Sequence, residues 1–222
     1  CLNNLNKSDY FNIITFNDSV ETYKKGLLKV NDNNVRKALK FVEGLEAGGG
    51  TNIDEALRNG LNLDKNSNHT STVLFLTDGQ PTAGVTNTSA ILDNLKKYNS
   101  EKAKIFVFGV GFDVNIQFLD KIATQQHGDS GYVRPEENIE STVSGIFTKI
   151  NMPVLTNLKI DYSNVEVTDT FPKELPDLFK GSQLLVFGRY RDGGSANIKI
   201  TGEVARHKKT FEFPVNFSNS EN

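Results

Sequence analysis

The stretch TVLFLTDGQP, residues 72–81, is a near-continuous apolar run that ends in a turn containing Asp78. Such a run is typical of a strand buried on both faces, as in a parallel sheet covered by helices. A second run of this kind, AKIFVFGVG, spans residues 103–111. Because ligands of parallel sheets collect outside the carboxyl ends of the strands, Asp78 stands where a binding residue is expected.

Helical periodicity flanks both apolar runs. Apolar residues recur at steps of three and four over residues 32–46, 53–61, 88–99 and 116–123. Strands that alternate with helices predict right-handed crossovers and a mostly parallel sheet. Apolar residues 1, 2 and 5 fall at helical spacing, which predicts a helix there. We also expect strands at 10–16, 20–23 and 131–134, and a closing helix at 136–150.

The pattern changes after Pro153. Apolar and polar residues alternate between turn residues, which predicts antiparallel strands with one solvent-exposed face. Five segments show this alternation, at residues 158–162, 165–171, 182–190, 196–204 and 209–217. We therefore expect an α/β domain over residues 1–152 and a β-strand segment of an adjoining sandwich over residues 153–222.

Composition excludes several classes of function. The 25 Lys and Arg residues against 27 Asp and Glu give a net charge of -2, which disfavours a nucleic-acid partner. A single cysteine, Cys1, excludes an intramolecular disulfide and a cysteine-based zinc site. No 18-residue apolar run is present, so direct membrane insertion by a helix is not expected. The glycines at 109 and 111 lack the third glycine of a dinucleotide fingerprint.

Residues 48–52, GGGTN, precede a helix and are expected at the same edge of the sheet as Asp78. A threonine hydroxyl and a carboxylate on glycine-rich loops are hard oxygen donors that suit Mg²⁺, Mn²⁺ or Ca²⁺. Structural roles stay open for both residues. Thr51 with Asp54 fits a helix N-cap with a variant capping box, and Asp78–Gly79 fits an ordinary turn.

Four segments in fixed order resemble the von Willebrand factor A domain of inter-alpha-trypsin inhibitor heavy chains and their prokaryotic relatives. They are YFNIITFNDSVE, GLEAGGGTNIDEAL, VLFLTDGQPTAGVTN and IFVFGVGFDVNIQFLDKIA. INMPVLTNLKIDY and DLFKGSQLLVFGRY resemble the segment that follows this domain, so the resemblance covers nearly all 222 residues. It implies a doubly wound, mostly parallel α/β sheet followed by antiparallel sandwich strands, with the first strand of the sheet missing.

The resemblance also implies a metal-ion-dependent adhesion site made of three loops. Thr51 matches the threonine of the second loop and Asp78 the aspartate of the third. An acidic side chain of a protein or extracellular-matrix ligand would complete the coordination of Mg²⁺, or of Mn²⁺ or Ca²⁺. Four further residues are expected at the rim or just behind these ligands: Gly50, Asn52, Gly79 and Asp113.

The first loop of that site, Asp-x-Ser-x-Ser, does not occur in the chain. We expect it, with the rest of an N-terminal half of the same protein, to precede Cys1. Metal binding is expected only when that loop is present, and weak or no binding by the 222 residues alone. The ending PVNFSNSEN lacks the Asp-Pro-His junction of the vertebrate heavy chains, so no hyaluronan linkage is expected.

The sequence therefore predicts a non-enzymatic, divalent-metal-dependent adhesion or protein-binding module of a larger extracellular or cell-surface protein. One alternative is a degenerate A domain that docks proteins without a metal. A second alternative is a Mg²⁺-dependent phosphoryl-transfer enzyme with Asp78 as nucleophile. No lysine-bearing phosphate loop accompanies Asp78, which disfavours the enzyme.

Overall fold

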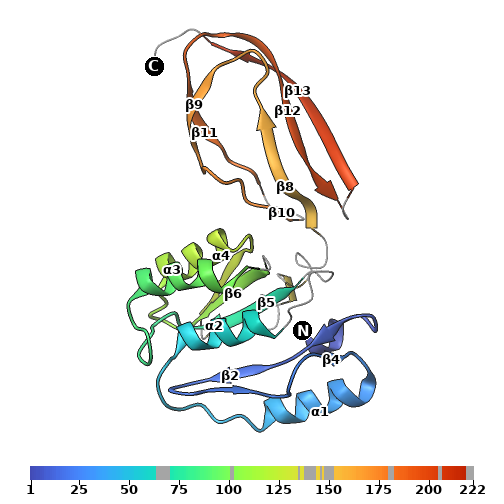
Figure 1. Cartoon of the computed structure of the whole chain (residues 1–222), viewed down its shortest axis with the longest axis vertical. Helices are drawn as coiled ribbons and strands as arrows, with labels where there is room; N and C mark the ends of the chain where they lie inside the picture. The colour runs from blue at the N-terminus through green and yellow to red at the C-terminus, as the bar shows by residue number, and fades with distance from the viewer. Residues whose placement is uncertain are drawn as a thin grey trace. The chain divides into compact units, whose positions relative to one another are not determined.

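The structure is a computed structural model that describes residues 1–63, 71–100, 103–134, 136–137, 144–145, 147, 153–179, 183–204 and 207–218. The chain divides into two compact units, Cys1–Ile146 and Phe147–Asn222. The first unit carries the helices, and the second is built from strands (Figure 1). The closing helix expected at 136–150 lies mostly outside the described residues.

A three-stranded parallel sheet forms the centre of the first unit. Its strands are β5 (Thr72–Thr77), β6 (Lys104–Val110) and β7 (Ser130–Val133), in that spatial order. Helix α3 (Thr88–Tyr98) connects β5 to β6, and α4 (Ile116–Gln125) connects β6 to β7 (Figure 1). The sequence prediction of an α/β fold with a parallel sheet is thus confirmed.

Strand β6 is buried on both of its faces. Ile105 and Val107 share one core cluster with Phe75 and with the buried residues of α2 (Ile53–Asn62), α3 and α4. Phe106 and Phe108 alternate with them, so they point to the opposite face, and each is at most 1% exposed. The apolar run at residues 103–111 arises from this two-sided burial.

The first 46 residues form a smaller layer. Its elements are η1 (Leu2–Asn4), β1 (Tyr10–Phe11), β2 (Ile14–Phe16), β3 (Val20–Thr22), β4 (Leu28–Lys29) and α1 (Asp32–Glu43). The expectation of a single strand at 10–16 is wrong. These residues form two strands, because the Asn12 side chain bonds backbone groups of residues 24 and 26 between them. Its amide donates to the Lys24 and Gly26 carbonyls, each at 2.7 Å, and its oxygen accepts from the Lys24 N–H at 3.2 Å.

The β2–β3 hairpin packs on the main core without joining the parallel sheet. The Phe16 ring stacks on Phe75 with 5.3 Å between centroids. Among the described strands, β2 pairs with β3 and β5 pairs with β6, and no backbone ladder joins β2 to β5. The turn of the hairpin, Asn17–Ser19, contacts the sheet-edge loops through hydrogen bonds from Asn52.

Asparagine begins each of the four described α-helices. The side chains of Asn31, Asn52, Asn87 and Asn115 each accept a hydrogen bond from the backbone N–H three residues later. This satisfies one of the N–H groups that a helix start leaves unpaired. The asparagine content of the chain thus has a structural use at all four helix starts.

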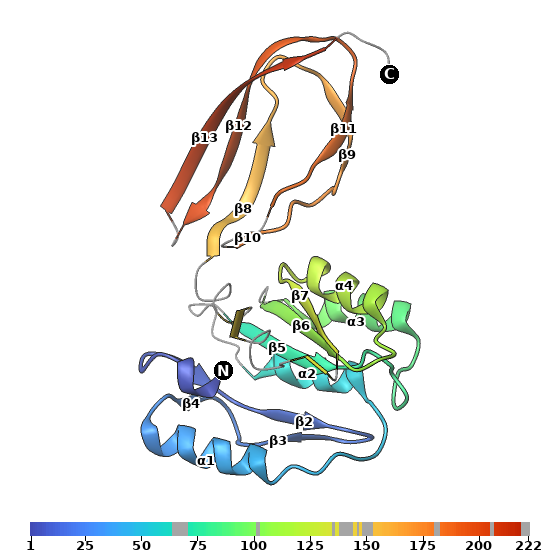
Figure 2. The same ribbon diagram turned by 180° about the vertical axis from the view of Figure 1, so that it is seen from behind.

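The described strands of the second unit pair antiparallel. Its strands are β8 (Pro153–Asp161), β9 (Val167–Phe171), β10 (Leu178–Phe179), β11 (Phe187–Tyr190), β12 (Gly194–Val204) and β13 (His207–Phe217). Four of them form a sheet in the order β10-β8-β12-β13, and β11 pairs with β9 (Figure 2). All five expected segments contain a strand, and β10 is an addition that the sequence pattern did not predict. None of the helices in the described part of the chain could span a membrane.

Candidate functional site

Two loops leave the carboxyl ends of β5 and β6 side by side. Thr77 and Gly109 are register partners in the parallel ladder, so Asp78 and Asp113 follow adjacent strand ends. The Gln80 side-chain amide donates to the Asp113 carbonyl at 2.7 Å, and the Asn115 N–H donates to the Asp78 carbonyl at 3.0 Å. The backbone of the Asp78 loop is therefore fixed against the loop that begins α4.

The Asp78 side chain makes a turn and still has an oxygen for a ligand. Its Oδ1 accepts from the Gln80 N–H at 3.0 Å, as in an Asx turn. No hydrogen bond to Oδ2 is found among the described residues, and the side chain is exposed. The predicted turn role is thus present, and it leaves one carboxylate oxygen free to bind a cation.

Gly79 is buried directly behind Asp78. Its φ is +76°, and a Cβ built on it would lie 2.8 Å from Cγ of Leu119, a core residue of α4. Glycine is therefore required here both by backbone conformation and by space. The turn that presents Asp78 is seated on the core of the first unit.

The Thr51 loop is joined to the Asp78 loop through Thr82. The Thr51 N–H donates to Thr82 Oγ1 at 2.8 Å, and the Thr51 carbonyl accepts from the N–H groups of Thr82 at 3.1 Å and Ala83 at 3.4 Å. The structure thus brings together the loops of the two predicted ligand residues. Whether Thr51 and Asp78 hold a metal stays a prediction.

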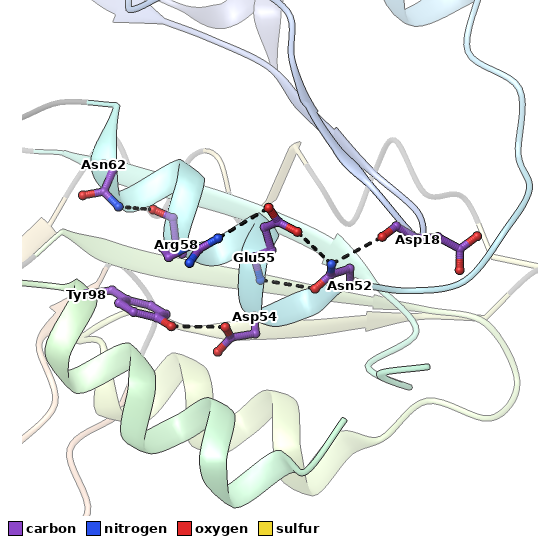
Figure 3. A network of polar contacts seen from close by, with 7 residues as sticks. All are labelled: Asp18, Asn52, Asp54, Glu55, Arg58, Asn62 and Tyr98. Carbon is purple, nitrogen blue, oxygen red and sulfur yellow. Dashed lines mark hydrogen bonds and ion pairs between the residues drawn. The ribbon is translucent and has the colours of Figure 1, made fainter. Parts of the chain in front are cut away.

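The residue that caps α2 is Asn52, so the alternative in which Thr51 is the N-cap is wrong. Asn52 Oδ1 accepts from the Glu55 N–H at 3.4 Å, and its amide donates to Glu55 Oε2 at 2.9 Å (Figure 3). The same amide reaches the Asp18 carbonyl at 3.4 Å, while the Asn52 N–H donates to the Asn17 carbonyl at 2.8 Å. Because Asn52 takes the capping role, the hydroxyl of Thr51 is not needed for it.

The glycines of the Thr51 loop make room for a carboxylate from the β2–β3 turn. A Cβ on Gly49 would lie 2.7 Å from Asp18 Oδ2, and a Cβ on Gly50 would collide with Asp18 Oδ1. Gly50 thus has a packing role that the sequence did not reveal. Neither Asp18 nor Thr82 was predicted as a site residue, although a run of three glycines is a signal for close approach of another group.

Polar contacts support the start of α2 from its other side. Asp54 is 7% exposed and accepts from the Asn94 amide at 2.9 Å. It also accepts from the Tyr98 hydroxyl at 3.2 Å (Figure 3). Burial, together with the Asp54 carboxylate, raises the pKa of Tyr98 above its usual value. Tyr98 therefore stays a neutral hydrogen-bond donor to Asp54.

The site is acidic and rich in oxygen donors. Residues 17–19, 48–52, 77–85 and 111–115 contain no Lys, Arg, His or Cys. Asp18, Asp78 and Asp113 are exposed, and no basic side chain in the described ranges forms an ion pair with them. Hydroxyl and carboxylate donors of this kind fit Mg²⁺, Mn²⁺ or Ca²⁺, and the lack of imidazole and thiolate in these loops disfavours zinc.

The described residues supply only part of a metal shell. Within the described parts of the chain, no group of three His, Cys, Asp or Glu side chains is placed to hold a metal ion. Thr51 and Asp78 are two oxygen ligands at most. Such a pair suits Mg²⁺, because Mg²⁺ gives up its water ligands reluctantly and usually binds only one or two protein carboxylates.

The comparison with protein families settles the class of the first unit. The family model for the von Willebrand factor type A domain matches residues 1–131. The chain belongs to this family. An A domain is a non-enzymatic protein-interaction module, which agrees with the prediction that the chain is not an enzyme.

Similar curated proteins are inter-alpha-trypsin inhibitor heavy chains. Human heavy chain H2 is 30% identical over 199 residues, and human heavy chain H4 is 29% identical over 221 residues. These alignments cover 85% and 95% of this chain but 21% and 24% of the relatives, so the chain spans about a quarter or less of their length. The resemblance predicted from the sequence motifs is confirmed.

Solved structures agree on the fold. A von Willebrand factor type A protein from Catenulispora acidiphila covers 97% of this chain, and the match covers 59% of that protein, with a TM-score of 0.64 at 14% identity. An aerotolerance-related membrane protein from Bacteroides fragilis covers 68% of this chain and 82% of its own, with a TM-score of 0.54 at 19% identity.

Proposed function

We propose that this A domain is a divalent-metal-dependent adhesion module that binds an acidic side chain of a protein or extracellular-matrix ligand. One observation carries the proposal. The loops of Thr51 and Asp78, 27 positions apart in the sequence, are hydrogen-bonded to each other at the carboxyl edge of the parallel sheet. The match of both residues to the loops of the family's metal site supports their role as ligands.

Each residue of the site has a separate role. Asp78 offers the carboxylate oxygen that its turn leaves unbonded, and Thr51 offers its hydroxyl. The bound ion would supply an open coordination position that a carboxylate of the ligand can fill. Asn52 holds the Thr51 loop on α2, Gly79 seats the Asp78 turn on the core, and Gly50 leaves space for the Asp18 carboxylate. Asp113 lies at the rim, held by its backbone to Gln80.

A protein partner suits the surface around these loops. Phe112 is 74% exposed and adjoins Asp113 in the loop that is bonded to the Asp78 turn. Aromatic side chains, phenylalanine included, are enriched in protein interfaces relative to the rest of the surface. We further propose an extracellular or cell-surface setting, and an A domain over residues 1–152 that is followed by sandwich strands over 153–222.

The test is metal binding by purified protein that includes any native sequence adjoining Cys1. Calorimetric titration with Mn²⁺ should show one site, and Asp78→Asn or Thr51→Val should weaken it at least tenfold, since each removes a charged or neutral ligand. Asp93→Asn is the matched control, because Asp93 lies exposed on α3 and pairs with Lys96 at 3.5 Å. Unchanged binding by Asp78→Asn would reject the proposed metal site.

A metal-free docking scaffold is the second candidate. It is favoured by the lack, among the described residues, of three acidic or histidine side chains placed around one point. In that case ligand binding would survive chelation by EDTA and would not respond to Asp78→Asn. Loss of ligand binding in EDTA with full recovery in Mg²⁺ would exclude the scaffold.

A further inference from the structure

Thr51 has little local support on its N-terminal side, whereas Asn52 on its C-terminal side is fixed by the cap of α2 and by the hairpin turn. Three glycines, residues 48–50, precede it, and glycine leaves the backbone more freedom than any other residue. Both backbone polar groups of Thr51 are instead satisfied from outside the loop, by Thr82 and Ala83. The position of the Thr51 hydroxyl therefore depends on the segment that follows Asp78.

Thr82 provides this support with its side chain and its backbone at once. Its hydroxyl accepts the Thr51 N–H at 2.8 Å, and its own N–H donates to the Thr51 carbonyl at 3.1 Å. The two bonds run in opposite directions and close a ring between the loops. Such a pair fixes both the distance and the orientation of Thr51 relative to Asp78, four residues before Thr82.

The side chain of Thr82 is exposed, as is the hydrogen bond it accepts. Water can therefore replace the hydroxyl at the Thr51 N–H when it is removed, so the folded state should lose little stability. A ligand residue is more sensitive, because coordination geometry tolerates displacements of only about 0.5 Å. The expected effect thus falls on metal affinity rather than on folding.

We propose that Thr82 is a positioning residue of the adhesion site, which holds the Thr51 hydroxyl at the distance from Asp78 that a bound cation requires. This inference rests on the proposed function. It adds a residue that family resemblance did not assign to the site. The group that acts is the Thr82 side-chain oxygen, so a variant that retains this oxygen should retain the function.

The experiment compares Mn²⁺ affinity and thermal unfolding for variants of the protein that includes any native sequence adjoining Cys1. Thr82→Val keeps the β-branched shape without the acceptor, and Thr82→Ala removes the acceptor without adding a methyl group near Gly50. Both should bind Mn²⁺ about fivefold more weakly, the effect of one neutral hydrogen bond. Thr82→Ser should bind within about twofold of the parent protein, since its hydroxyl remains.

Thr86→Val is the matched control, because Thr86 is an exposed threonine further along the same loop. It should leave the affinity unchanged, and all four variants should unfold in EDTA within about 3 °C of the parent. Parental affinity in both Thr82→Val and Thr82→Ala would overturn the inference. So would a loss in Thr82→Ser as large as in Thr82→Ala.

The result for Asp78→Asn distinguishes failure of the metal site from failure of the role proposed for Thr82. If Asp78→Asn abolishes Mn²⁺ binding while Thr82→Ala does not weaken it, the proposed function stands and the role of Thr82 is wrong. If Asp78→Asn leaves binding unchanged, the metal site itself is wrong, and the role of Thr82 falls with it.

Discussion

Replacing Gly79 with alanine should destabilise the first unit strongly, although the change adds one methyl group. The backbone cost of φ +76° for a residue with a Cβ is about 1–2 kcal/mol. The new Cβ would lie 2.8 Å from Leu119 Cγ and 3.1 Å from both its methyl carbons, and overpacking of this kind costs roughly 1–3 kcal/mol. The sum is about 2–5 kcal/mol of unfolding free energy.

Thermal unfolding followed by circular dichroism in EDTA measures this loss. For a chain of this size, each kcal/mol lowers Tm by roughly 2–4 °C, so Gly79→Ala should lower Tm by about 4–20 °C. Metal affinity should fall as well, because a shift of the turn away from Leu119 moves Asp78. A urea titration at constant temperature gives the free energy directly.

Two glycines serve as matched controls. Gly26 has a φ of +98° and nothing within 4 Å of an added Cβ, so Gly26→Ala isolates the backbone cost and should lose about 1–2 kcal/mol. Gly48 has open space and no positive φ, so Gly48→Ala should be nearly neutral. If Gly79→Ala lost no more stability than Gly26→Ala, the argument that Leu119 seats the Asp78 turn would be refuted.

Three further predictions concern the support and the rim of the site. Asn52→Ala should lower the unfolding free energy measured in urea by about 1–3 kcal/mol, more than the roughly 1 kcal/mol expected for Asn31→Ala. The reason is that Asn52 is 6% exposed and bonds both Glu55 and the hairpin turn. Equal losses in the two variants would contradict this. Burial and the hydrogen bond to the Asp120 carboxylate raise the pKa of Tyr132 above its usual value of about 10. The stability from its neutral form is complete below about pH 10 and falls as pH rises toward the raised pKa, so Tyr132→Phe should flatten the alkaline loss of unfolding free energy; an unchanged slope would count against it. Phe112→Ser should weaken binding of a protein ligand severalfold in a pull-down titration with Tm unchanged, and undiminished binding would remove Phe112 from the interface.

The elements that sequence patterning predicted best are those whose two faces are both buried. The run TVLFLT became β5 at the expected residues, and the run at 103–111 became β6 at Lys104–Val110. A continuous apolar run of strand length that is rich in β-branched and aromatic residues and ends in a turn favours a buried strand over a buried helix. Helix α3 ended within one residue of the expectation, because Asn87 begins it and Asn99 stops it.

Patterning failed where side chains replaced backbone partners. Nothing in YFNIITF shows that Asn12 would bind the carbonyls of Lys24 and Gly26 and divide the strand. Thr51 and Asn52 are both good N-caps, and local sequence does not choose between them. The choice follows from the hairpin turn, which places the carbonyls of Asn17 and Asp18 beside Asn52.

The sequence predicted the two candidate ligands of the site but not the residues that support them. Asp78 and Thr51 were found because loops at the carboxyl edge of a parallel sheet are a general binding position, and family resemblance then matched each of them to a ligand. Asp18 and Thr82 were missed, because their roles depend on contacts between loops that lie more than 30 positions apart in the sequence. A glycine run next to a predicted ligand would have been the signal to search for such a contact.

The most direct measurement is anomalous diffraction from crystals of the protein grown or soaked with Mn²⁺, using a form that includes any native sequence adjoining Cys1. The account predicts an anomalous peak at the carboxyl edge of the parallel sheet, in direct contact with an Asp78 carboxylate oxygen and beside the Thr51 hydroxyl. The peak should disappear in Asp78→Asn crystals. A well-ordered edge without such a peak at saturating Mn²⁺, or a peak that persists in Asp78→Asn, would contradict the account.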